Sequence, residues 1–189
     1  ILNKETGLLP PKTLLSHITL MQHSSYHKLL LVSDVAIIPL PNLEQKKIMT
    51  TYLLKAAKKL GYLNPKVAFI AATEQVINAM PACTDAVALK TFFAEQNEQC
   101  DGPMGLDLAI DREAVKIKSF KSVVAGDADC LLFPNIEAGN VFYKTATKFC
   151  HAETAAVVVG TQVPVVLSSR GDTMRTKLNS IALAALLVS

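Results

Sequence analysis

Short apolar runs alternate with longer stretches of helical periodicity along most of this chain, and this alternation constrains its fold more than any other feature. Residues 66–72 form one such apolar run, typical of a strand that is buried on both faces. In residues 42–60 apolar side chains recur every three or four positions, and Gly61 is a natural helix C-cap. The alternation predicts an α/β fold, with a mostly parallel sheet and helices on both of its faces.

The other predicted elements continue this order along the chain. Strands are expected over residues 14–21, 29–33, 105–110, 128–133, 155–159 and 163–167. Helices are expected over residues 84–99, 111–119, 138–150 and 174–188. Thr84 or Asp85 would cap the first of these helices, because hydroxyl and carboxylate side chains accept hydrogen bonds from the free N–H groups of a first turn.

The segment 164–173 is the strongest candidate for a ligand site. Its apolar part, a predicted buried strand, is followed at once by a polar cluster that contains Ser169, Arg170 and Asp172. Open α/β proteins hold anionic ligands where the carboxyl ends of strands meet helix N-termini. A lone arginine at the end of a buried strand is costly to desolvate unless it meets a carboxylate or an anion. These residues therefore predict a phosphate-handling site.

Polar residues that adjoin other predicted strands are further candidates. Gly139 and Asn140, with Lys144 one turn into the helix, suit the close approach of a phosphate, although the first two could also be a helix-start cap. Asp101 and Gly102 precede a proline, and this combination is also typical of a turn. Both interpretations stay open for each group on this reading of the residues.

Composition and the motif inventory narrow the function classes. A net charge of +3 with scattered lysines argues against a nucleic-acid partner and favours a small anion as the ligand. The four cysteines lie far apart without a CxxC pair, as in a reduced cytoplasmic protein, and the four histidines show no metal-site spacing. We therefore predict no metal and a cytoplasmic location. The motifs of P-loop proteins, dinucleotide-binding folds and α/β hydrolases are missing.

Neither the apolar segments nor the start of the chain predicts a membrane span or a secretion signal. The longest uncharged run, residues 154–169, is broken by Gly160 and Pro164 and is too short to span a bilayer. The start of the chain lacks the pattern of a signal peptide. No membrane partner is predicted.

Four ordered motifs give the chain a family resemblance. Residues 129–144 strongly resemble the PDxxAGNxxYK-type segment of the phosphate acetyl/butyryltransferases. Residues 122–128 are similar to the SPVAGxAD stretch of that family, residues 101–107 to its DGPLALD segment, and residues 166–172 to its final SRG/SRA loop. The resemblance covers residues 14–188.

Further details resemble the butyryl branch more than the acetyl branch, namely residues 14–17, 26–30 and 80–86. The family fold resembles that of isocitrate and isopropylmalate dehydrogenases, in which two α/β domains flank a cleft. The resemblance implies that residues 1–160 are the inserted domain. Residues 161–189 would be a strand–helix return segment that belongs to a first, largely absent domain.

The same resemblance implies an enzyme that transfers an acyl group reversibly between coenzyme A and inorganic phosphate. Butyryl-CoA and phosphate would give butyryl phosphate and CoA, with coenzyme A as a substrate and no tightly bound cofactor. A homo-oligomer, dimer or larger, is expected. The alternatives are a phosphate acetyltransferase that uses acetyl-CoA, and a non-catalytic or truncated domain that binds CoA and phosphate. A decarboxylating dehydrogenase of the related fold would need a cluster of metal-binding aspartates, which the sequence does not supply.

The resemblance also implies roles for individual residues. Arg170 would stabilise negative charge on the phosphoryl group or the developing oxyanion, with Ser169 donating a hydrogen bond beside it. Gly139, Asn140 and Lys144 would line the phosphate side of the cleft.

Asp101, Gly102 and Glu137 would complete the substrate-binding set. Acetyl-transferring relatives carry an aspartate seven residues after the motif serine, thought to deprotonate the CoA thiol, but Thr176 stands there in this chain. A threonine cannot be a general base at neutral pH. Asp172, three residues past the serine, is the predicted substitute.

Overall fold

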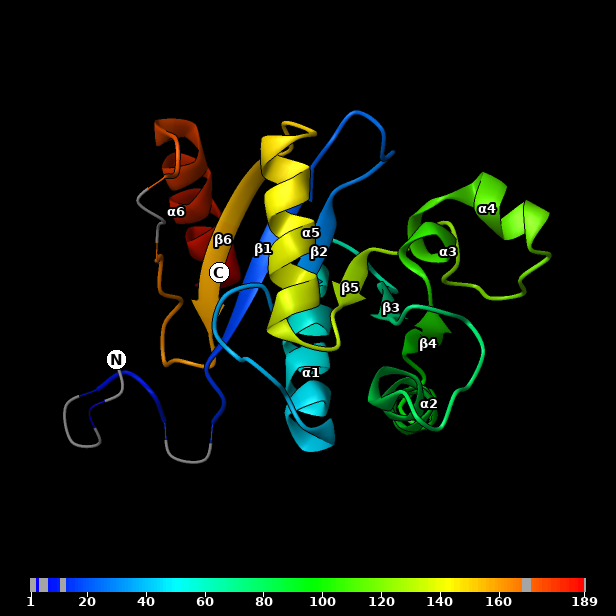
Figure 1. Cartoon of the computed structure of the whole chain (residues 1–189). Helices are drawn as coiled ribbons and strands as arrows, with labels where there is room; N and C mark the ends of the chain where they lie inside the picture. Colours follow the sequence, from blue (N-terminus) through cyan, green and yellow to red (C-terminus); the bar gives the residue numbers. More distant parts are fainter. Residues whose placement is uncertain (1–2, 4–6, 11–12, 168–170, 189) are drawn as a thin grey trace.

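The computed structural model describes residues 3, 7–10, 13–167 and 171–188 of the chain. These residues contain one six-stranded sheet in the order β4-β3-β5-β2-β1-β6 (Figure 1). The strands are β1 (Ser16–Gln22), β2 (Leu30–Ser33), β3 (Lys66–Ile70), β4 (Gln99–Met104), β5 (Cys130–Leu132) and β6 (Glu153–Val159). The helices are α1 (Leu43–Lys59), α2 (Pro81–Ala94), α3 (Leu106–Ile110), α4 (Arg112–Ile117), α5 (Ile136–Lys148) and α6 (Met174–Val188).

The directions of the strands determine which ends meet at the functional edge. Strands β2, β5, β3 and β4 pair in parallel, whereas β1 is antiparallel to both of its neighbours, β2 and β6. The carboxyl ends of β2 to β6 therefore share one edge of the sheet with the amino end of β1. The predicted mostly parallel sheet is confirmed.

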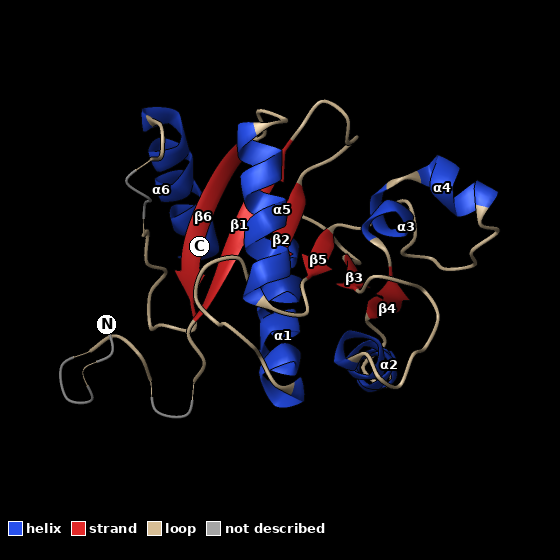
Figure 2. Ribbon diagram, in the orientation of Figure 1, coloured by secondary structure: helices blue, strands red, loops and turns tan. Residues whose placement is uncertain are grey.

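Helices cover both faces of this sheet, as predicted (Figure 2). Alternate strand residues supply the two layers of the core, because successive side chains of a strand point to opposite faces. Leu31 and Phe69 pack in the layer with α1, α2 and α6. Val32 and Ala68 pack in the layer with α3 and α5.

Helix α1 forms where its periodicity predicts it. Asn42 accepts a hydrogen bond from the Gln45 main-chain N–H, and the Gln45 side chain accepts one from the Asn42 N–H, which completes a capping box. Met49 and Leu53 are fully buried against the sheet. Gly61, with φ of +96°, follows the last turn in the left-handed conformation that glycine adopts without strain.

One predicted element just after residue 100 was wrong. Residues 106–110 form helix α3, with Gly105 as its N-cap, instead of a strand, and the strand of this region is β4, one segment earlier. A short apolar run does not by itself distinguish strand from helix, and the edge position of β4 tolerates Pro103, which has no N–H to donate. Gly102 is needed in this strand, because a Cβ atom there would come within 2.7 Å of Phe69.

Helix α2 begins earlier than predicted. Its N-cap is Met80, and Pro81 occupies the first turn, so Thr84 and Asp85 lie inside the helix and do not cap it. Proline suits this position because its missing N–H would have no partner there anyway. Asp85 instead accepts a hydrogen bond of 2.7 Å from the buried Lys46 ammonium.

The predicted strand over residues 163–167 was also wrong in extent. Within the described residues, this segment pairs with the sheet only through an isolated bridge between Val158 and Val165. Their main-chain groups exchange hydrogen bonds of 2.8 and 3.2 Å. The next ladder position would pair residue 167 with Ala156, but the Ala156 N–H already donates to the Ser180 hydroxyl of α6.

Helix α6 closes the described part of the chain, as predicted. The Ser180 hydroxyl accepts a hydrogen bond of 2.9 Å from the Ala156 main-chain N–H of β6, and Leu183 is buried in the core. Helix α6 thus packs on the same sheet as α1. The assignment of residues 161–189 to another domain stays a prediction.

An ion-pair network holds the amino ends of the strands at the opposite edge of the sheet. The Asp127 carboxylate accepts hydrogen bonds from Lys66 at 2.7 Å, His27 at 2.8 Å and Arg112 at 3.0 Å. Burial acts to raise the pKa of Asp127, but these hydrogen bonds outweigh it and hold the pKa well below its usual range.

Candidate functional site

A buried carboxylate organises the edge where β1 begins and β2 ends. Oδ2 of Asp34 accepts hydrogen bonds from the Ser16 hydroxyl at 2.9 Å and the His17 main-chain N–H at 3.0 Å. Its Oδ1 accepts from the main-chain N–H groups of Ala36 and Ile37, both at 2.8 Å. The charge of Asp34 is thus satisfied by four donors, and the loop after β2 is fixed to β1.

Helix α5 lies directly on this loop. The Asn135 side chain caps the helix, and the Asn140 side-chain amide donates a hydrogen bond of 2.9 Å to the Val35 carbonyl. Gly139 lies against the main chain of Asp34 so closely that a Cβ atom would collide with the Asp34 carbonyl oxygen. Gly139 and Asn140, which were predicted to line a phosphate, therefore position the start of α5 against the loop after β2.

Helix α5 carries two further predicted residues on exposed positions. Glu137 lies in the first turn, where a negative charge complements the helix dipole. The Lys144 ammonium lies 5.2 Å from the centroid of the Tyr143 ring. Lys144 and Tyr143 both face the segment that precedes α6.

A cavity of about 150 Å³ separates α5 from that segment. It is lined by Tyr143, Lys144, Thr147, Lys148, Ala152, Thr154, Gly171, Asp172, Thr173 and Thr176. Two ammonium groups, one carboxylate and several hydroxyls thus converge on a space for a small anion. Of the predicted site residues, the structure brings Lys144 and Asp172 together here.

Burial, together with nearby carboxylates, shifts the pKa of Tyr143 in the cavity wall and of His17 in β1. Burial raises the pKa of Tyr143, and the nearby charge of Asp172 raises it further, so the phenol is a neutral hydrogen-bond donor at neutral pH. Burial also lowers the pKa of His17, against the opposing charges of Asp34 and Asp172. The imidazole of His17 is thus neutral at neutral pH, and its Nδ1 lies 3.4 Å from the Thr19 hydroxyl.

The segment before α6 contains the other predicted catalytic residues. Ser169 and Arg170 lie outside the described residues. Thr173 caps α6, because its hydroxyl oxygen accepts a hydrogen bond of 3.1 Å from the Thr176 main-chain N–H. The Thr176 hydroxyl lies 3.1 Å from that of Thr173, at the mouth of the same cavity.

Asp101 and Gly102 lie at the other end of the sheet. They belong to β4, which is the outermost strand on one side of the sheet, whereas β6 is the outermost strand on the other side (Figure 1). The cavity adjoins β6. The Asp101 carboxylate accepts hydrogen bonds from the Gly102 N–H at 2.8 Å and pairs with the Lys90 ammonium at 2.6 Å. The structure therefore does not bring these two residues together with Lys144 and Asp172.

Sequence reasoning missed three polar residues of the paired strands β1 and β6: His17 and Thr19 of β1, and Thr154 of β6. All three are buried within strands. A polar side chain is costly to bury unless it has a hydrogen-bond partner. The polar residues that interrupt these apolar runs could therefore have been recognised in the sequence.

Within the described ranges, no group of three or more His, Cys, Asp or Glu side chains is placed to hold a metal ion. No described helix is long and apolar enough to cross a membrane.

Curated relatives resemble the chain over nearly its whole length. It is 44% identical over 189 residues to the phosphate butyryltransferase of Clostridium acetobutylicum, covering 98% of this chain and 62% of that protein. It is 38% identical over 187 residues to the phosphate acetyltransferase of Thermotoga maritima, covering 97% of this chain and 63% of the relative. The chain thus spans about three fifths of the length of these relatives.

Solved structures share the fold. A branched-chain phosphotransacylase from Enterococcus faecalis V583 superposes with a TM-score of 0.90 at 35% identity, covering 99% of this chain and 67% of that one. A phosphotransacetylase from Streptococcus pyogenes gives a TM-score of 0.80 at 22% identity, which shows the fold alone; 95% of this chain and 55% of that one are covered.

The family description "Phosphate acetyl/butaryl transferase" matches residues 4–185. This match includes α5, the segment before α6 and the cavity between them. The family resemblance drawn from the four motifs is confirmed: the chain belongs to the phosphate acetyl/butyryl transferase family.

Proposed function

We propose that this chain is the anion-holding part of an enzyme that transfers acyl groups reversibly between coenzyme A and inorganic phosphate. The preferred reaction is butyryl-CoA and phosphate to butyryl phosphate and CoA. The observation that carries the proposal is the convergence of Lys144, Lys148, Tyr143 and Asp172 on one small cavity, in a chain of this family. Coenzyme A is then a substrate, and no tightly bound cofactor is required.

In the direction that consumes acyl phosphate, the thiolate of CoA attacks the acyl carbon and the bond to the phosphate oxygen breaks. The ammonium groups of Lys144 and Lys148 balance the charge of the departing phosphate, and the neutral Tyr143 phenol donates a hydrogen bond to it. Asp172 takes the thiol proton in place of the family aspartate that Thr176 replaces. Arg170 and Ser169 stabilise the oxyanion on the acyl carbon.

The sequence identities favour butyryl over acetyl transfer. The phosphate butyryltransferases of two Clostridium species are 44% and 42% identical to the chain, against 38% for the phosphate acetyltransferase of Thermotoga maritima. Transfer from acetyl-CoA is the second candidate, and a domain that binds CoA and phosphate without turnover is the third. Rates with butyryl-CoA and acetyl-CoA at equal concentration separate the first two.

The organisation of the whole protein belongs to the same proposal. Residues 1–160 form the inserted domain of a two-domain enzyme, and residues 161–189 return to its first domain. The chain covers about three fifths of the relatives' length, which leaves room in them for a further domain. A cytoplasmic homo-oligomer is proposed, and light scattering of the purified protein measures its size.

The release of free thiol from butyryl-CoA on addition of phosphate tests the activity. We expect Arg170→Ala and Lys144→Met to lower kcat/KM at least about tenfold. The first removes the positive charge that stabilises the oxyanion, and the second removes one that balances the departing phosphate. Lys116→Met, which alters an exposed ammonium paired with Glu113 on α4, is the matched control and should leave the rate unchanged. Wild-type turnover by folded Arg170→Ala and Lys144→Met proteins would contradict the proposal. Binding of CoA without thiol release would favour the third candidate.

A further inference from the structure

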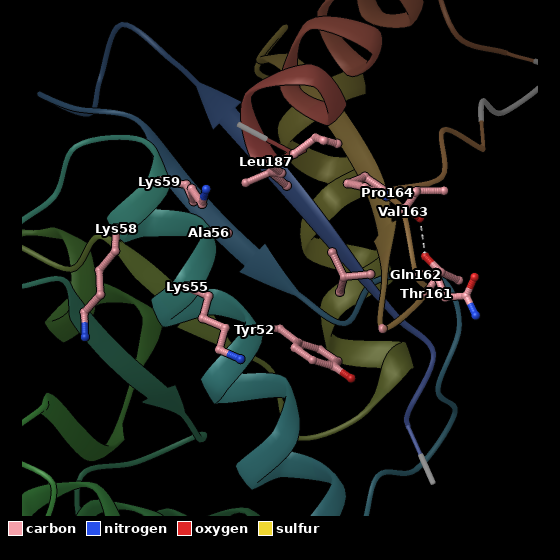
Figure 3. A pocket seen from close by; sticks show the side chains of 13 residues that line it. Tyr52, Lys55, Ala56, Lys58, Lys59, Thr161, Gln162, Val163, Pro164 and Leu187 are labelled. Atoms are coloured by element: carbon pink, nitrogen blue, oxygen red, sulfur yellow. Dashed lines mark hydrogen bonds between the residues drawn. The ribbon is translucent and has the colours of Figure 1, made fainter. Parts of the chain in front are cut away.

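A second and larger cavity lies on the other face of the sheet from the candidate site. It has a volume of about 650 Å³, within the range of small-molecule sites. Helix α1, the segment after β6 and the end of α6 enclose it (Figure 3). Its lining residues Ala56, Val159 and Leu187 belong to the core layer under α1, whereas Tyr143 of the candidate site belongs to the layer under α5.

The walls of this cavity are mainly apolar. Ala56 and Tyr52 form the α1 side, and Val163, Pro164 and Leu187 face them across the space (Figure 3). The Tyr52 hydroxyl donates a hydrogen bond of 3.1 Å to the Leu14 carbonyl, so its ring, and not its hydroxyl, is offered to a ligand. Such walls suit an apolar chain.

Among the described residues, the charged groups at the rim are all of one sign. Lys55, Lys58 and Lys59 line the cavity, and none of the other described lining residues is acidic. Lys58 is already paired with Glu98 on another element. Within the part of the chain that the structure describes, neither Lys55 nor Lys59 makes an ion pair, although Lys59 also complements the C-terminal end of the α1 dipole. The rim therefore has positive charge available for a ligand.

We propose that this cavity is a binding site for an amphiphilic anion, a carboxylate or phosphate head on a short apolar chain. The apolar chain of the ligand occupies the space between Tyr52 and Leu187, and its anionic head lies between the ammonium groups of Lys55 and Lys59. An apolar wall selects for the chain, and the uncompensated ammonium groups select against neutral and cationic analogues. The site is separate from acyl transfer, and binding here does not depend on turnover.

Calorimetric titration of the protein expressed from its complete gene tests this site. The probes are octanoate and hexyl phosphate, with octylammonium as the charge control and inorganic phosphate as the head alone. We expect octanoate or hexyl phosphate to bind with one ligand per chain, and octylammonium and inorganic phosphate to bind at least about tenfold more weakly. The tighter of the two anions identifies the head group.

Two changes in the protein locate the binding. The double variant Lys55→Glu/Lys59→Glu reverses the rim charge, and Val163→Trp fills the cavity; each should weaken the tighter anion about tenfold or more. Lys116→Glu and Ile117→Trp, both at exposed positions of α4, which does not line the cavity, are the matched controls and should bind as the unaltered protein does. Unaltered thermal melting confirms that each variant is folded.

The proposal is overturned if neither anion binds at millimolar concentration, or if octylammonium binds as tightly. It is equally overturned if binding survives in both the charge-reversed and the cavity-filled proteins. Because every readout is binding, a failure here leaves the thiol-release result unaffected, and the reverse also holds.

Discussion

Replacement of Asp34 by alanine is the sharpest test of how the edge of the sheet is built. The carboxylate is 2% exposed and accepts four hydrogen bonds, two of them from buried donors on β1, the Ser16 hydroxyl and the His17 N–H. The other two donors, the N–H groups of Ala36 and Ile37, are only partly buried and can bond to water.

The magnitude follows from the two buried donors. A buried polar group left without its partner costs about 1–3 kcal/mol. The His17 N–H loses its acceptor, whereas the Ser16 hydroxyl still lies 3.3 Å from the Ser33 hydroxyl. We therefore expect Asp34→Ala to lower the free energy of unfolding by about 2–4 kcal/mol. That is a large part of the 5–15 kcal/mol that is usual for a folded protein. Asp34→Asn keeps one oxygen acceptor and should lose less.

Urea unfolding followed by circular dichroism measures this difference. The midpoint should fall while the slope of free energy against urea stays the same, since the same surface is exposed on unfolding. Glu113→Ala, at an exposed position on α4, is the control and should change the free energy by no more than about 0.5 kcal/mol. A loss below about 1 kcal/mol for Asp34→Ala would refute the reasoning, because the donors would then have found other partners.

Two other predictions rest on the same kind of contact. Because the pKa of Asp127 is lower in the folded protein than in the unfolded chain, its hydrogen bonds with Lys66 and His27 stabilise the fold above the unfolded pKa of about 4, and this contribution is lost as the pH falls below it. Asp127→Asn should therefore flatten the decline in urea midpoint between pH 7 and pH 3, and an unchanged decline would count against the network. Gly139→Ala should shift α5 away from the Asp34 carbonyl, lowering both the unfolding temperature and thiol release from butyryl-CoA; full activity in that variant would show that the seat of α5 does not matter for the site.

The helices, and the sheet that they cover on both faces, could be predicted from local patterns in the sequence. The capping residue Asn42, the periodic apolar residues of α1 and the terminating Gly61 are close in sequence, so their interactions can be inferred without knowledge of the fold. Helices α5 and α6 were also predicted, but α5 begins two residues earlier than expected and Asn135, not Gly139 or Asn140, caps it. The alternation of these helices with apolar runs was enough to predict an α/β sheet covered on both faces, and the motifs were enough to predict the family.

Pairing partners and neighbours distant in sequence were decided only in three dimensions. The antiparallel direction of β1 and the edge position of β4 depend on which strands meet, and no local pattern carries that information. Residues 105–110 were mistaken for a strand for this reason. The neighbouring strand β4 supplies the edge of the sheet, and the apolar residues of α3 pack instead on the face that α5 also covers.

The candidate site divides in the same way. The sequence predicted Lys144 and Asp172 as site residues, because both follow the ends of predicted strands. The structure places both in the lining of one cavity. Only tertiary structure showed that Gly139 is needed for contact with Asp34 and that Asp101 lies at the far edge of the sheet. A motif records which residues a family keeps, but whether a residue touches a ligand or positions a helix depends on side chains that come from distant parts of the chain.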